Sequence, residues 1–233
     1  MGMPIRVEGD IDAAGVFAWL RWVDATFSTY RADSEISRLD RGELDDPHPL
    51  VREVLARCEA LRAETGGLFD ARAGGRLDPS GYVKGWAVQR AAALGRGRCL
   101  IDAGGDVVLR GTWRVGIRHP YERDRLAAAI TVSDCAVATS GAYERGPHIL
   151  DPRTGRPATG LSSVTVVGRD LGTADAYATA AFVAGDPRWT APLAAMSIAG
   201  DRVFTTASWP RSGTRRARRS SRRPSAPALA AGS

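Results

Sequence analysis

One segment of the chain, Asp78-Pro79-Ser80-Gly81-Tyr82-Val83-Lys84-Gly85, contains the only lysine among 31 arginines. It combines a carboxylate, a flexible glycine and an amine at the expected start of a helix, where free backbone N–H groups favour anions. In a chain this rich in arginine, a surface position that needs only a positive charge would be expected to be arginine. Lys84 therefore indicates that this position requires a compact ammonium. The alternative interpretation is a solvated lysine on the first turn of a helix.

A second pair of oxygen-bearing side chains, Asp175 and Thr179, lies in an alanine-rich stretch that we expect to be helical. Residues four apart project from the same face of a helix. A carboxylate beside a hydroxyl suits Mg²⁺, which keeps few protein ligands and completes its octahedron with water and phosphate. An aspartate near a helix start is also a favourable partner of the helix dipole, and this interpretation explains Asp175 equally well.

Polar and turn-forming residues are concentrated in the segment 139–157 and in a glycine pair, Gly104-Gly105. The segment holds His148, whereas the other two histidines each precede a proline and are typical of turns. A loop of this length is uncommon unless it is functional, although a loop imidazole with satisfied hydrogen bonds is the alternative for His148. The glycine pair permits close approach of a ligand to the backbone, but a plain hairpin turn accounts for it as well.

The elements that must position these residues follow from periodicity and turn residues. Apolar spacing predicts helices after Asp10 up to Phe27, from Pro49 to the stop at Gly66-Gly67, over 82–94 and over 173–183. Apolar runs predict strands over 99–101, 107–109, 113–117, 129–132, 136–138 and 163–167. Helices and strands come partly in blocks, so we expect an α+β fold.

Composition limits the class of protein. Of 233 residues, 44% are hydrophobic and 25% charged, as in ordinary globular proteins. The net charge of +6 does not indicate a basic domain, because residues 211–233 carry seven arginines and no acidic residue. The rest has 25 basic and 26 acidic side chains, so we expect no specific nucleic-acid binding.

The same reasoning gives the expected organisation and compartment. We expect one compact catalytic unit over residues 1–207 and a disordered Arg-rich tail over 208–233. Three scattered cysteines indicate reduced thiols. No apolar run reaches the roughly 18 residues of a membrane span, and none has the pattern of a signal peptide, so we expect a cytoplasmic protein.

In this order, the motifs resemble those of the ApbE family of FAD:protein FMN transferases over residues 1–205. The matching segments are Asp78 with Lys84-Gly85-Trp86-Ala87, Gly104-Gly105-Asp106, Thr139 to Arg145, His148 to Pro157, and Ala174 to Thr179. The upstream segment from Phe27 to Leu39 also matches. One such motif would be weak evidence, whereas six in the same order are specific.

The resemblance implies a duplicated fold like that of the tunnelling-fold proteins, and Mg²⁺-dependent transfer of FMN from FAD to a Ser or Thr hydroxyl of an acceptor flavoprotein, with release of AMP. It implies that Asp175, Thr179 and the backbone carbonyl of Gly81 hold the metal, and that His148 is the general base. The residues it places at the FAD are Asp78, Lys84, Gly104, Gly105, Ser140, Tyr143, Arg145, His148 and Ile149, with Lys84 facing the pyrophosphate. Two alternatives use the same residues: a Mg²⁺-dependent FAD pyrophosphatase and a non-catalytic flavin-binding protein.

Overall fold

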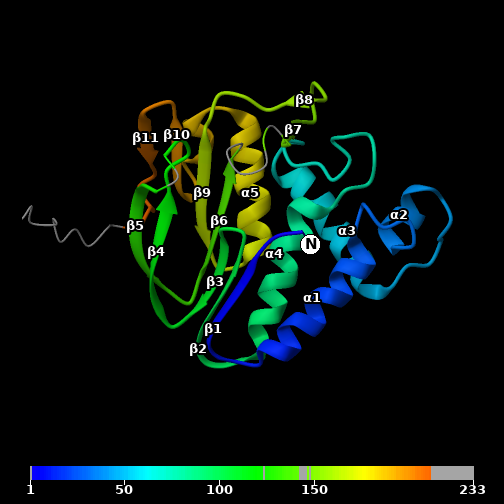
Figure 1. Ribbon diagram of the computed structural model, residues 1–233. Coiled ribbons are helices and arrows are strands. Elements are labelled where there is room, and N and C mark those ends of the chain that lie inside the picture. The colour runs from blue at the N-terminus through cyan, green and yellow to red at the C-terminus, as the bar shows by residue number, and fades with distance from the viewer. Residues whose placement is uncertain (1, 123, 142–145, 147, 211–233) are drawn as a thin grey trace, which may run out of the picture.

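One antiparallel sheet of seven strands organises the chain, in the order β1-β2-β3-β6-β9-β10-β11 (Figure 1). The structure is a computed structural model that describes residues 2–122, 124–141, 146 and 148–210. The strands are β1 (Ile5–Ile11), β2 (Gly95–Ala103), β3 (Asp106–Arg110), β6 (Ala136–Gly141), β9 (Ser163–Gly168), β10 (Ala194–Ala199) and β11 (Arg202–Thr205). Because β1 pairs with β2 and β11 pairs with β10, elements from both ends of the described chain belong to one sheet.

Helices cover one face of this sheet in two layers (Figure 1). The inner helices are α4 (Ser80–Ala91), which continues into a 3₁₀ turn over Ala92–Leu94, and α5 (Leu171–Ala184). Outside α4 lie α1 (Ala13–Phe27), α2 (Glu35–Asp40) and α3 (Pro49–Glu64), and a second 3₁₀ turn spans Pro187–Thr190. The inner helix α5 is rich in alanine and buried around most of its circumference, which lets it lie close to both the sheet and α4.

A two-stranded ribbon, β4 (Thr112–Arg118) with β5 (Leu126–Ser133), covers the other face of the sheet. A separate apolar cluster that includes Leu109, Ile130 and Ile198 fills the space between this ribbon and the sheet. A shorter ribbon, β7 (Leu150–Asp151) with β8 (Arg156–Pro157), lies in the polar segment after β6. The predicted α+β mixture of helices and strands is therefore confirmed.

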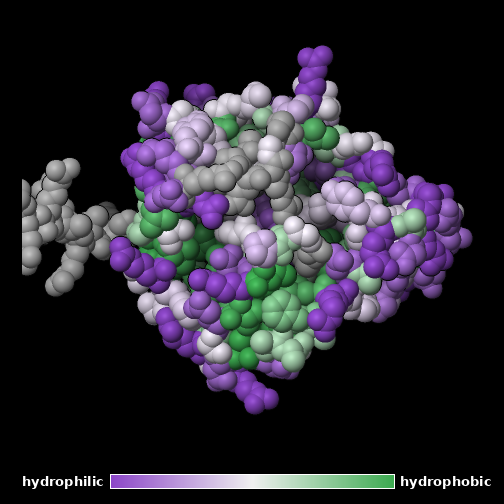
Figure 2. All heavy atoms as spheres, in the orientation of Figure 1, coloured by the Kyte–Doolittle hydropathy of each residue, from purple (hydrophilic) through white to green (hydrophobic). Residues whose placement is uncertain are grey.

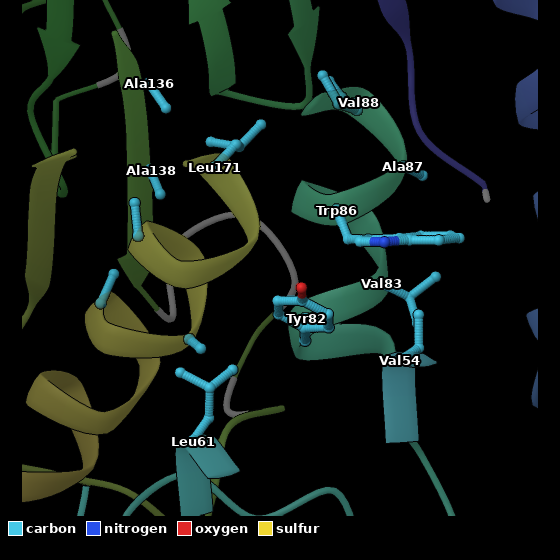
Figure 3. Packing of buried hydrophobic residues seen from close by; sticks show 14 of the residues in the cluster. Val54, Leu61, Tyr82, Val83, Trp86, Ala87, Val88, Ala136, Ala138 and Leu171 are labelled. Atoms are coloured by element: carbon cyan, nitrogen blue, oxygen red, sulfur yellow. The ribbon is translucent and has the colours of Figure 1, made fainter. Parts of the chain in front are cut away.

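Two glycines allow the inner helices to touch through their backbones. A Cβ atom added to Gly85 of α4 would lie 2.6 Å from the carbonyl oxygen of Leu171, and one added to Gly172 of α5 would lie 2.6 Å from Cε2 of Tyr82. Figure 3 shows Tyr82 on the side of α4 that faces α5, whereas Trp86 points away from α5. This close packing fixes the position of Lys84, which precedes Gly85, relative to α5.

The structure corrects several predicted boundaries. Asp12, not Asp10, caps α1 by accepting a hydrogen bond from the backbone N–H of Gly15. The helix expected over 82–94 begins at Ser80 and ends as an α-helix at Ala91. Strands β1, β10 and β11 were not predicted.

On the face drawn in Figure 2, an apolar region lies over β1, α1 and α4, and hydrophobic residues also reach the surface over the β4–β5 ribbon. Within the described residues, none of the helices combines the length and the apolar character needed to cross a membrane. All three cysteines, Cys58, Cys99 and Cys135, are free thiols, as expected.

Candidate active site

Lys84 lies between two buried carboxylates. Its ammonium forms a short ion pair with Oδ2 of Asp106 and lies 3.5 Å from Oδ2 of Asp175. The two carboxylate side chains are 1% and 4% exposed, and that of Lys84 is 22% exposed. Buried charges are costly unless they are paired, so the three groups stabilise one another. The interpretation of Lys84 as a solvated surface lysine is wrong.

Asp106, the first residue of β3, was not among the predicted site residues. While one of its oxygens pairs with Lys84, the other accepts a hydrogen bond from the backbone N–H of Thr139 in β6 at 2.9 Å. Asp106 therefore connects α4, β3 and β6. The signal that could have identified it is its place directly after the glycine pair, where the Gly-Gly-Asp motif ends.

Asp175 and Thr179 lie on successive turns of α5 and reach different partners. Asp175 faces Lys84, and the hydroxyl of Thr179 lies 3.1 Å from the hydroxyl of Ser140 in β6. Asp170 begins α5 as its N-cap by accepting a hydrogen bond from the backbone N–H of Thr173 at 2.7 Å. The structure thus brings together Lys84, Ser140, Asp175 and Thr179 from three separate motifs.

The segment before Lys84 forms the start of α4. The carboxylate of Asp78 accepts a hydrogen bond from the backbone N–H of Ser80 at 3.0 Å, and Asp78 itself is exposed. Gly81 lies one turn before Gly85, and a Cβ added to it would lie 3.2 Å from the ring of Phe69. Asp78 and Gly81 are therefore close to Lys84 along the helix, and their predicted roles at FAD and metal stay predictions.

The loop that leads into this segment is held by Asp40 of α2. Its carboxylate accepts a hydrogen bond from the backbone N–H of Leu77 at 2.8 Å and pairs with Arg76 at 3.3 Å and Arg72 at 3.6 Å. The Leu77 hydrogen bond, followed by the arginines, holds the pKa of Asp40 below its usual value. The entry to α4 is thereby fixed by charge as well as by packing.

The glycine pair forms the turn between β2 and β3. Gly104 and Gly105 have φ values of +64° and +93°, a region that favours glycine. The N–H of Gly105 donates to Oδ1 of Asp102 at 2.9 Å, and a Cβ added to Gly105 would meet no atom within 4 Å. The hairpin explains why both positions are glycine. The open space at Gly105 leaves room for a ligand, and the contact of Gly104 and Gly105 with FAD stays a prediction.

His148 is exposed, and its ring is oriented by the preceding backbone. The ring Nδ1 lies 2.9 Å from the carbonyl oxygen of Gly146. A carbonyl only accepts, so Nδ1 carries the proton and the neutral ring keeps its lone pair on Nε2. In this tautomer, Nε2 is the nitrogen that can accept a proton. Of the other predicted residues in this segment, Tyr143 and Arg145 lie outside the described residues.

The residues after His148 form a compact turn. The carbonyl of Ile149 accepts a hydrogen bond from Ala158 at 2.8 Å, and the side chain of Ile149 packs against the main apolar cluster. Asp151 accepts hydrogen bonds from the Arg153 side chain and, through its backbone carbonyl, from Gly155. The Arg153 guanidinium holds the pKa of Asp151 below its usual value, so this carboxylate stabilises the turn.

A metal at this site would be held by few protein ligands. Among the described residues, no three or more His, Cys, Asp or Glu side chains are grouped to hold a metal ion. Of the two carboxylates beside Lys84, Asp106 already uses both oxygens, so the donors left for a metal are Asp175 and neutral oxygens such as that of Thr179. Such an oxygen-only, weakly charged donor set suits Mg²⁺ and does not suit zinc or copper.

The chain is similar to proteins of known family. A sequence profile described as "ApbE family" matches residues 1–75 and 71–199. A protein of Rhodobacter capsulatus named FAD:protein FMN transferase is 32% identical over 213 residues, which cover 83% of this chain and 38% of that protein. One of the same name from Treponema pallidum (strain Nichols) is 36% identical over 183 residues, 63% of this chain and 50% of that one. The chain thus spans half or less of the length of these two relatives.

Two solved structures share the fold. The crystal structure of the ApbE protein from Thermotoga maritima has a TM-score of 0.81 at 22% identity and covers 89% of this chain and 94% of that chain. The structure of the flavin transferase ApbE from Vibrio cholerae has a TM-score of 0.78 at 24% identity, with 89% and 95% covered. At these identities, the likeness establishes the arrangement of helices and sheet.

Proposed function

The chain belongs to the ApbE family, and on this premise we propose that it transfers FMN from FAD to a serine or threonine hydroxyl of an acceptor protein and releases AMP. The names of the related proteins support this activity. The observation that carries it is the meeting of separate motifs around Lys84, with Asp106 and Asp175 against its ammonium and Ser140 against Thr179.

The donor set fits Mg²⁺, and Asp175, Thr179 and the carbonyl of Gly81 would hold it. The Lys84 ammonium and the carboxylates of Asp106 and Asp175 together carry one negative charge, which favours a further cation. When bound, Mg²⁺ would supply charge neutralisation at the phosphates of FAD.

The side chains have separate roles in the proposed reaction. The Lys84 ammonium stabilises negative charge on the pyrophosphate, and His148 accepts the proton of the acceptor hydroxyl at Nε2. The hydroxyl oxygen forms a bond to the phosphorus of the FMN moiety while the pyrophosphate bond breaks, and AMP leaves with the bridging oxygen. Asp78, Gly104, Gly105, Ser140, Tyr143, Arg145 and Ile149 are the residues proposed to bind FAD.

The experiment is to incubate the purified protein with FAD, Mg²⁺ and a candidate acceptor. Transfer predicts AMP in solution together with an acceptor heavier by one FMN in mass spectrometry. AMP with free FMN and an unmodified acceptor would identify a pyrophosphatase. Bound FAD with no AMP at all would identify a flavin-binding protein and refute the enzymatic proposal.

We also propose that residues 1–207 form one catalytic unit with a duplicated, tunnelling-fold-like architecture. The shared sheet supports one unit, and the presence of one inner helix per half, α4 and α5, supports duplication. Limited proteolysis that gives two stable halves cut near residue 97 would contradict the single unit. The Arg-rich tail over 208–233 lies almost wholly outside the described residues, and its disorder stays a prediction, as do the cytoplasmic location and the lack of specific nucleic-acid binding.

A further inference from the structure

We propose that Asp106 is a positioning residue, which holds the Lys84 ammonium where it can face the phosphates of FAD and keeps it from closing on Asp175. This inference rests on the proposed function, because it assigns the reason for which the site contains a second carboxylate. In the proposal, Asp106 binds neither the metal nor the substrate.

The geometry makes Asp106 a rigid anchor. Its side chain is 1% exposed and uses both oxygens, one for Lys84 and the other for the backbone N–H of Thr139 at 2.9 Å. As the first residue of β3, it follows the β2–β3 turn, whose Gly105 donates a hydrogen bond to Asp102. Its backbone and its carboxylate are therefore both fixed by the sheet.

Lysine needs such an anchor because its four-carbon side chain has many rotamers and its ammonium is a point charge without directional shape. Lys84 has two carboxylates within reach, in a short ion pair with Asp106 and at 3.5 Å from Asp175. Without the charge of Asp106, Asp175 would be the carboxylate that remains for the ammonium among those described within reach. Lys84 would then compete with a cation for the carboxylate that is proposed to bind it.

The second hydrogen bond of Asp106 makes a selective substitution possible. In Asp106→Asn, the side-chain carbonyl can still accept from Thr139, whose neighbour Ser140 contacts Thr179. The substitution removes the negative charge opposite Lys84 and places there an amide NH2 group, which cannot accept a hydrogen bond from the ammonium. Asp106→Asn therefore tests the ion pair while it keeps the link between β3 and β6.

The test is a double-mutant cycle on the full chain with FAD affinity as readout, measured by fluorescence titration in the presence of Mg²⁺. Asp106→Asn should weaken FAD binding by about tenfold or more, the loss expected for one charge-assisted hydrogen bond. In a Lys84→Met background, the same substitution should change FAD affinity less than about twofold, because there is no ammonium left to position. Asp134→Asn is the matched control, since Asp134 also accepts a backbone N–H, from Gly111 at 2.7 Å, and should leave affinity unchanged.

Two results for Asp106→Asn would overturn the inference. Asp106→Asn could bind FAD like the wild type, or it could lose the same factor in both backgrounds, as a purely structural role requires. If Asp106→Asn is too unstable to purify, the double variant Asp106→Asn/Lys84→Met is measured instead. The inference requires that the double variant folds and binds FAD as Lys84→Met does, and weaker binding by the double variant would contradict it. A wild-type protein that does not bind FAD would instead refute the proposed function.

Discussion

Substitution of Gly85 by alanine should destabilise the protein although it places a better helix former in the middle of α4. The added Cβ would lie 2.6 Å from the carbonyl oxygen of Leu171 and 2.7 Å from Cα of Gly172. Both are backbone atoms of α5, so no side chain can rotate away. The helices must separate until these contacts exceed 3.0 Å, below which Cβ atoms are essentially never found.

The magnitude follows from two opposing terms. Replacing glycine by alanine within a helix stabilises by about 1 kcal/mol. Forcing an extra methyl into a packed interior costs about 1–3 kcal/mol, and a rigid backbone contact places Gly85 at the upper end. We expect a net loss of about 2 kcal/mol, which for a domain of this size lowers Tm by about 4–8 °C.

Thermal unfolding followed by circular dichroism measures this change, and Gly81→Ala is the matched control. Its Cβ would meet only the ring of Phe69, at 3.2 Å, and that ring can shift slightly. Gly81→Ala should therefore unfold no more than about 2 °C below the wild type and up to about 4 °C above it, since the gain in helix propensity of about 1 kcal/mol offsets the small shift of the ring. A Gly85→Ala protein as stable as the wild type, or more so, would refute the close contact between α4 and α5.

The remaining predictions concern single groups. Asp175→Asn should leave the protein folded and abolish AMP release at limiting Mg²⁺, measured by chromatography; full AMP release there would disprove the metal assignment. His148→Ala should bind FAD normally and lose transfer by about 10²–10⁴-fold, whereas weak binding with normal turnover at saturating FAD would rule out the base. The depressed pKa of Asp40 means that its contact with Leu77 stabilises above the ordinary carboxyl pKa and is lost as pH falls through the lowered value. Cleavage within residues 72–77 should accordingly stay slow from pH 5 to neutrality, because pH 5 is about one unit above an ordinary Asp pKa and Asp40 stays ionised there. An acid-stable protease should cut this segment only in stronger acid. Equal cleavage in strong acid and at neutral pH would contradict the role of Asp40. Burial raises the pKa of Cys58 to about 12, so this thiol should resist alkylation near pH 8 until the protein is denatured, as peptide mass mapping would reveal.

Helices and central strands could be predicted because their signals are local. The stop of α5 at Gly185, with φ of +70°, and the strands at the centre of the sheet follow from turn residues and apolar runs. Strands β1, β10 and β11 were missed for a physical reason. In β1, Gly9 interrupts the alternation of apolar and polar residues, and β11 has four residues. β10 is rich in alanine, which favours helices, and it is a strand because it pairs with β9 and β11.

The chemistry of the site was easier to predict than its contacts. The solitary Lys84 and the spacing of Asp175 and Thr179 are visible in residue types alone. The pairing of Lys84 with Asp106 depends on how α4 lies against the sheet, and its approach to Asp175 depends on backbone packing at Gly85. Such long-range packing leaves no periodic trace in the sequence.

The presence of one lysine in 233 residues makes the chain suited to spectroscopy at a single amine. Reductive methylation with ¹³C-formaldehyde would label Lys84 and the terminal amine, and the two differ in ordinary pKa, about 10.4 against about 8. With 22% of its side chain exposed, Lys84 is accessible to a small reagent, and its dimethylammonium keeps the positive charge. One methyl resonance would then follow the ion pair with Asp106 directly, without any engineered probe.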